Sequence, residues 1–207
     1  MFKQLQFLAA PAALTLLITV SPLAAGPGAD SFTFDMVVSA GAKACVPNAT
    51  AKVTITPVGS VETMEVSVQG LPAKSEFTLF VIQVPKGPFG ISWYQGDILT
   101  DKNGRGHQRF IGVFSIETFA LAPGSAPAPI VFGSGPFPDA SVNPPFNPIQ
   151  MYHLGLWFGS PATAQAAGCP ATITPFNGEH NAGIQVLNTS NFPDDQGPLR
   201  KVNPSTP

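Results

Sequence analysis

The sequence has little charge, and this shortage excludes two classes of protein. Asp, Glu, Lys and Arg make up 11% of its 207 residues, against about 25% in typical globular chains. The formal net charge is −2, so there is no excess of basic residues to bind phosphates. Nucleic-acid binding and intrinsic disorder both need more charge than this, and we expect neither.

The sequence also lacks the local motifs of common enzymes and metal sites. It has no G-x-S-x-G elbow, no H-E-x-x-H pair, no EF-hand spacing and no heptad repeat. The 23 Pro and 20 Gly are too many for a helical protein, whereas the 16 Phe suit the pleated surface of a strand. We therefore predict an all-β protein and favour a binding role over catalysis.

The first 25 residues predict a signal peptide. Lys3 provides the positive start, an apolar run follows from Phe7 to Val20, and small residues come at Ala24-Ala25-Gly26. The run is shorter than the roughly 20 residues of a membrane span. We expect a secreted or cell-envelope protein. The alternative is a leader that is not cleaved, and this leader would be the only expected contact with a membrane.

Two cysteines, Cys45 and Cys169, fit an exported protein. A lone pair usually bonds in an oxidising compartment, so a disulfide is predicted, with two separate buried thiols as the alternative. The bridge would close a loop of about 125 residues, worth roughly 4–5 kcal/mol in the chain-entropy model.

Alternation of apolar and polar residues predicts a series of antiparallel strands. The expected strands cover residues 31–39, 50–58, 61–69, 77–84, 91–99, 107–119, 151–158 and 183–188.

Two packed sheets are the expected arrangement, an antiparallel β-sandwich of Ig-like or jelly-roll type. A single domain is predicted over 26–190, with a Pro-rich excursion at 120–150 and a flexible polar tail at 191–207. A single helical turn is expected at Ala164–Ala167. Residues 76–119, at the expected centre of the sheet, hold the turn TDKNGRG, where Asp101 should cap backbone amides.

One stretch resembles a known group of proteins. The order GLP, a strand, Y-x-G-D-I-x-T-D-x-N-G-x-G and an aromatic strand, from Gly70 to Phe119, is similar to secreted bacterial β-sandwich modules of unassigned role. The resemblance implies the fold and the export, and it carries no catalytic residue.

Metal binding is one functional alternative. The candidate ligands are His107, His153 and His180 with Glu179, because imidazole and carboxylate groups bind Zn or Cu. Their spacings are not local, so only the fold can bring them together. Three unrelated structural or surface histidines are the favoured interpretation.

Exposed aromatic rings would indicate a second alternative, a carbohydrate-binding module. Trp93, Tyr94 and Trp157 are the candidates for a platform, although most aromatic side chains of a sandwich belong to its core. The leading hypothesis is an exported, non-catalytic module with a binding, adhesion or envelope-associated structural role. Its expected partner is a surface protein or a glycan.

Overall fold

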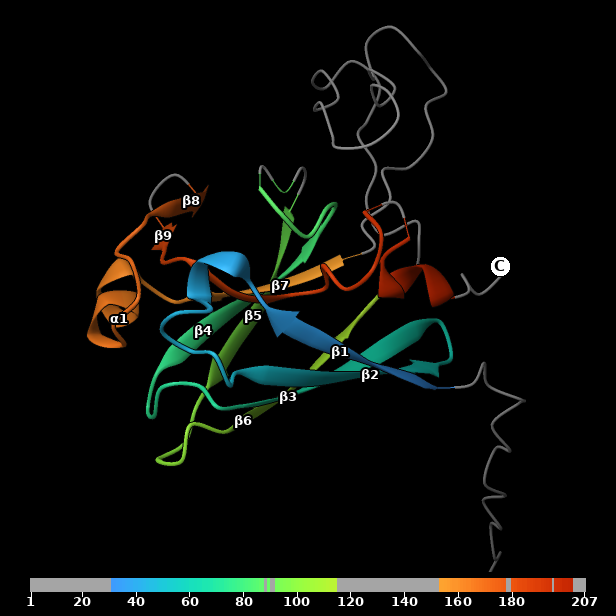
Figure 1. Ribbon diagram of the computed structural model, residues 1–207. Coiled ribbons are helices and arrows are strands. Elements are labelled where there is room, and N and C mark those ends of the chain that lie inside the picture. Colours follow the sequence, from blue (N-terminus) through green and yellow to red (C-terminus); the bar gives the residue numbers. More distant parts are fainter. Residues whose placement is uncertain are drawn as a thin grey trace, which may run out of the picture.

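The computed structural model describes residues 31–87, 89, 92–114, 153–177, 180–194 and 196–202, without the side chains of 175–177 and 180. The expected signal peptide (1–25) and Pro-rich excursion (120–150) lie outside the described residues, as does Glu179. The described part is all-β with few helical residues (Figure 1).

Eight strands form one antiparallel sheet in the order β5-β4-β7-β10-β1-β2-β3-β6. A separate two-stranded sheet joins β8 and β9. The strands of the large sheet are β1 (Phe32–Val38), β2 (Thr50–Val58), β3 (Val61–Gln69), β4 (Glu76–Ile82), β5 (Ser92–Leu99), β6 (Gly106–Gly112), β7 (His153–Phe158) and β10 (Gln185–Asn188). The remaining elements are β8 (Thr174–Asn177), β9 (His180–Ala182), helix α1 (Pro161–Ala166) and the 3₁₀ helices η1 (Ala40–Ala42) and η2 (Pro198–Lys201).

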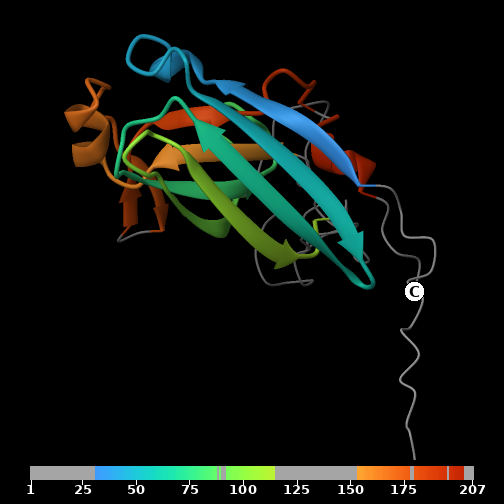
Figure 2. The ribbon, with the colours of Figure 1, turned by 90° about the horizontal axis from the view of Figure 1, so that it is seen from below.

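The predicted two-sheet sandwich is not confirmed, because one strand joins both halves of the sheet. The first part of β1 pairs with β2, from Phe32 opposite Ile55 to Met36 opposite Ala51. The last two residues, Val37 and Val38, pair with β10 instead. The result is a nearly closed, barrel-like sheet, whose β1, β2, β3 and β6 lie side by side in Figure 2.

The edge strands β5 and β6 approach each other where the sheet nearly closes. A Cβ added at Gly96 of β5 would lie 2.7 Å from Cε1 of Phe110 on β6. Only glycine therefore allows this close approach, since real Cβ atoms do not come so near a ring carbon.

The turn between these strands is built as the sequence predicts. Asp101 Oδ1 accepts hydrogen bonds from the N–H groups of Asn103 (2.7 Å) and Arg105 (3.0 Å). These two bonds lower the pKa of the Asp101 carboxyl, because they favour its charged form. Gly104 has φ +70°, and a Cβ there would lie 2.0 Å from the carbonyl oxygen of Leu71. The predicted turn at TDKNGRG, with Asp101 as its cap, is confirmed. The strands it joins do not pair as a hairpin, however, because β5 and β6 are the two edges of the sheet, so the expectation that residues 76–119 form the centre of the sheet was wrong.

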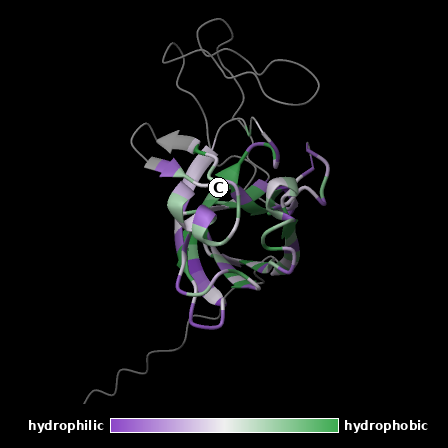
Figure 3. Ribbon diagram, turned by 60° about the vertical axis from the view of Figure 1, so that its left-hand side comes forward, coloured by the Kyte–Doolittle hydropathy of each residue, from purple (hydrophilic) through white to green (hydrophobic). Residues whose placement is uncertain are grey.

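Two apolar clusters cover the two faces of strands β4 and β7. The main core lies inside the sheet and includes Leu154, Leu156 and Phe158 of β7. A smaller outer cluster contains Phe80, Ile82, Trp157 and Ala182, with Phe89 packed against it. Strand β4 is therefore covered on both faces, as its unbroken apolar run predicts. Figure 3 shows hydrophobic and hydrophilic residues interspersed along the strands.

The predicted disulfide joins Cys45, just after η1, to Cys169, just after α1, with a Cα–Cα distance of 5.2 Å. It links parts of the chain that are 124 residues apart. Helix α1 overlaps the helical turn expected at 164–167 but begins three residues earlier and ends at Ala166. It begins with a capping box, in which Ser160 and Thr163 satisfy each other's backbone N–H groups.

Residues 191–207, expected as a polar tail, contain a segment that packs on the domain. Helix η2 lies in this segment, and its Leu199 is fully buried in the main core together with Val202. Asn191 also donates a hydrogen bond from Nδ2 to the carbonyl oxygen of Asp35 (3.2 Å). Apolar side chains that are this sparse among polar residues carry no periodic signal, so the sequence did not reveal their burial.

Candidate functional site

His153 is fully buried at the start of β7, and the protein itself occupies both of its ring nitrogens. Nε2 lies 3.1 Å and 3.0 Å from the carbonyl oxygens of Pro193 and Asp194. Because carbonyls only accept, Nε2 carries the proton, and Nδ1 accepts from the Thr189 hydroxyl at 2.8 Å. Burial lowers the pKa of His153, although these carbonyl contacts partly oppose it. The neutral ring ties β7 to the segment after β10.

The other histidines stand on different elements. His107 is exposed on the edge strand β6, opposite Ser67 of β3. His180 begins β9, and its side chain is outside the described set, as is the whole of Glu179. Among the described residues, no group of three or more His, Cys, Asp or Glu side chains could hold a metal ion. His153 is a structural residue, since ligation would break its bonds to Thr189 or to the carbonyls.

Tyr94 has an exposed ring that two contacts hold in place. Its ring meets that of Phe80 edge-on, with 5.7 Å between centroids, and its hydroxyl donates to Asp97 Oδ2 at 2.8 Å. Partial burial, the bond to Asp97 and the nearby charges of Asp97 and Glu76 raise the pKa of Tyr94 to about 12. The phenol is therefore a neutral donor at any physiological pH.

The three candidate platform residues do not form one flat surface. Trp157 is fully buried beneath Phe80, with ring centroids 5.5 Å apart. Trp93 and Tyr94 are 52% and 47% exposed, but successive strand residues point to opposite sides. Trp93 pairs with Val81 of β4 and Tyr94 pairs with Phe80. Tyr94 and Trp157 both contact the ring of Phe80, but of these two candidate residues only Tyr94 has an exposed ring.

Exposed apolar side chains concentrate near the two edge strands. Of the seven large ones among the described residues, five lie on β5, on β6 or just after it: Trp93, Tyr94, Leu99, Ile111 and Val113. Edge strands usually carry charge to discourage association, whereas most of the large exposed apolar side chains of the described residues lie at these two edges of the sheet.

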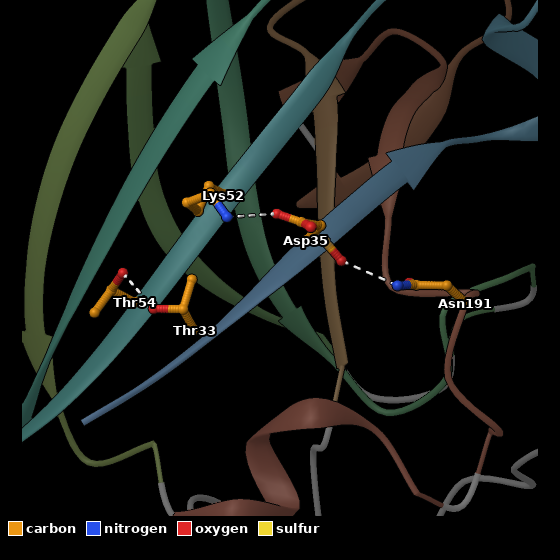
Figure 4. Close-up of polar contacts among 5 residues, drawn as sticks. All are labelled: Thr33, Asp35, Lys52, Thr54 and Asn191. Atoms are coloured by element: carbon orange, nitrogen blue, oxygen red, sulfur yellow. Dashed lines mark hydrogen bonds and ion pairs between the residues drawn. The ribbon is translucent and has the colours of Figure 1, made fainter. Parts of the chain in front are cut away.

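The outer face of β1, β2, β3 and β6 has the opposite character. Two polar rows cross all four strands in register: Thr33–Thr54–Glu65–Arg109 and Asp35–Lys52–Ser67–His107. Lys52 Nζ lies 3.2 Å from Asp35 Oδ1 and the Thr33 and Thr54 hydroxyls are 3.0 Å apart, as Figure 4 shows. Arg109 Nε lies 3.2 Å from Glu65 Oε1. Such exposed pairs contribute at most about 1 kcal/mol each, so this face is chiefly a hydrated one.

Glu62 is a buried acid that the sequence analysis did not single out. Its Oε2 accepts a hydrogen bond from the N–H of Phe114 at 2.6 Å. Burial raises the pKa of Glu62, and the bond to Phe114 only partly opposes this. The carboxyl fixes the point where the chain leaves β6, with Phe114 in the main core. Strand alternation places Glu62 on the same face as Met64 and Val66, and this was the signal that could have predicted its burial.

No protein-family model matches the chain, and no curated protein matches its sequence significantly. Within the described residues, no helix is long and apolar enough to span a membrane.

Proposed function

We propose that the protein is an exported, non-catalytic β-domain that acts by binding, with the edge strand β5 as its contact surface. The observation that carries the proposal is the fixed, half-exposed ring of Tyr94, held by Phe80 and by Asp97. A ring that is already held loses little conformational entropy when a partner covers it. Aromatic anchors of this kind dominate the energy of many interfaces.

Export is supported by two features of the chain. Residues 1–25 have the plan of a signal peptide, and the Cys45–Cys169 bridge is of a kind that persists in oxidising compartments. We therefore place the protein outside the cytoplasm, secreted or in the cell envelope, where its partner is a surface protein or a glycan.

The contact between Tyr94 and Asp97 favours a glycan as a second, more specific candidate. A sugar ring would stack on the exposed phenol while its hydroxyls donate to the Asp97 carboxylate. The exposed Leu99 on the same strand favours a protein surface instead, because apolar area gains most from burial against apolar area.

Binding of the purified, oxidised protein to whole cells of its host and to a glycan array tests the proposal. Tyr94→Ala should weaken binding about tenfold, or about 1.4 kcal/mol, as the loss of a central aromatic residue does. Ile173→Ala is the matched control, because Ile173 is a large exposed apolar residue outside β5 and β6. Equal binding by wild type, Tyr94→Ala and Ile173→Ala would refute β5 as the contact surface.

Two further variants identify the partner class. Tyr94→Phe keeps the ring and removes the hydrogen bond to Asp97. It should therefore weaken the binding of a glycan and leave the binding of an apolar protein surface nearly unchanged. Leu99→Ala should have the reverse effect. Export is tested separately by fractionating the host and titrating free thiols, and a cytoplasmic protein with two reduced cysteines would contradict it.

A further inference from the structure

A shallow groove lies at the end of β1, on a part of the surface that the proposed binding strand does not include. Two adjoining pockets, of about 720 Å³ and about 600 Å³, share Val37, Val38 and Pro47 as lining residues. Each is within the size range of small-molecule sites. We call this feature the β1 groove, and its shared floor is apolar.

The two ends of the β1 groove carry positive charge. Lys43 and Lys86 line one end, beside Asn188 and Ser190. Neither lysine takes part in an ion pair among the described residues. Lys52 lines the other end with Asp35.

Among the described residues, Asp35 is the only carboxylate that lines either pocket, and it is paired with Lys52 at 3.2 Å (Figure 4). With three lysines and one aspartate, the lining carries a net charge of +2, whereas the whole chain has −2. A hollow of one charge sign concentrates ligands of the opposite sign.

The backbone that carries the two unpaired lysines is held in place. Lys43 lies two residues before Cys45, whose disulfide fixes the loop after η1. The carbonyl of Lys86 accepts the N–H of Phe89 at 2.9 Å. The carbonyl of Pro85 accepts from Nε2 of Gln185, on β10, at 3.1 Å. The lysine stems remain adaptable, but their attachment points are set before a ligand arrives.

We propose that the β1 groove binds a small amphiphilic organic anion. A carboxylate, sulfate or phosphate group lies between Lys43 and Lys86, and the apolar body of the ligand covers Val37, Val38 and Pro47. The lysines favour a ligand with an anionic group, and the apolar floor favours a ligand that also has an apolar body. This site does not depend on the binding role of β5.

The probe is decanoate, titrated below its micellar concentration into the oxidised protein and followed by calorimetry and by amide NMR shifts. We expect saturable binding with the largest shifts at Val37, Val38, Lys43 and Ser190. Inorganic phosphate supplies the charge alone and decanol the apolar chain alone, so each should bind at least fivefold more weakly. Raising the salt concentration to about 1 M, where the Debye length is about 3 Å, should weaken the binding of decanoate but not the binding of decanol.

Removal of both lysines distinguishes this site from general attraction to a cationic surface. Lys43→Gln/Lys86→Gln should weaken decanoate about fivefold, consistent with two partly exposed charge contacts. Lys74→Gln/Lys102→Gln removes the same charge from exposed positions near the β5–β6 turn and should leave binding unchanged. Equal effects of the two double variants would overturn the proposal. So would shifts outside the groove, no saturable binding, or phosphate binding as tightly as decanoate. All these outcomes leave the role of Tyr94 unaffected.

Discussion

Removing the Cys45–Cys169 disulfide should lower the free energy of unfolding by about 5 kcal/mol. The bridge closes a loop whose ends are 124 residues apart. In the chain-entropy model a loop of this length restricts the unfolded chain by about 16 cal/mol/K, which is about 5 kcal/mol at 25 °C. For a domain of this size the melting temperature should fall by roughly 10–20 °C.

Urea denaturation of wild type and of Cys45→Ala/Cys169→Ala, followed by circular dichroism, measures this change. The m-value should rise in the variant, because the unfolded chain becomes less compact and exposes more surface. The control is the wild-type protein, kept reduced by a strong reductant and not alkylated. It has the same open loop but keeps both sulfur atoms, including that of the buried Cys169.

Three outcomes have distinct meanings for this prediction. Similar losses in the variant and in reduced wild type agree with an effect on the unfolded chain. A loss in the variant alone would assign the stability to packing of the sulfur atoms. A loss below about 1 kcal/mol in both, with an unchanged m-value, would refute the reasoning.

Two further predictions concern buried titratable groups. The lowered pKa of His153 means that the folded protein prefers the neutral ring. Stability should therefore be complete above the unfolded pKa of about 6.5 and fall as the pH drops through the folded pKa. Urea midpoints at pH 7 and 5.5 should differ in wild type, and the part of the difference due to His153 should vanish in His153→Gln; equal differences in both would contradict this. The raised pKa of Glu62 means that stability falls as the pH rises through its folded pKa. Glu62→Gln should therefore be at least as stable as wild type at pH 7 by the same assay, and a clear loss there would show that the charged bond to Phe114 outweighs burial.

The alternation of apolar and polar residues was sufficient to predict most of the strands. The ranges 50–58 and 61–69 were predicted with the bounds of β2 and β3 and with the hairpin between them. The alternation in residues 151–158 correctly separated Leu154, Leu156 and Phe158, in the main core, from Trp157 on the other face. These predictions succeeded because side-chain alternation is a property of the strand itself. Strands β8 and β9 were missed, because three or four residues are too few to establish a period.

The same alternation could not predict which strands pair with each other. Nothing in the sequence of β1 indicates that its first part pairs with β2 and its last two residues with β10. That change of partner is what turns an expected sandwich into a nearly closed sheet. Register and closure depend on how all the strands twist and pack together, so they are decided by the assembled sheet.

The sequence by itself determined the all-β class, most of the strand positions, the TDKNGRG turn and, through two lone cysteines behind a predicted signal peptide, the disulfide. Tertiary structure alone decided the environments of the candidate residues. It buried His153 against Thr189 and Trp157 behind Phe80, left Tyr94 at the surface, and collected Lys43 and Lys86 in one groove. The physical reason is that pKa, exposure and charge complementarity depend on neighbours distant in the chain, which no local pattern records.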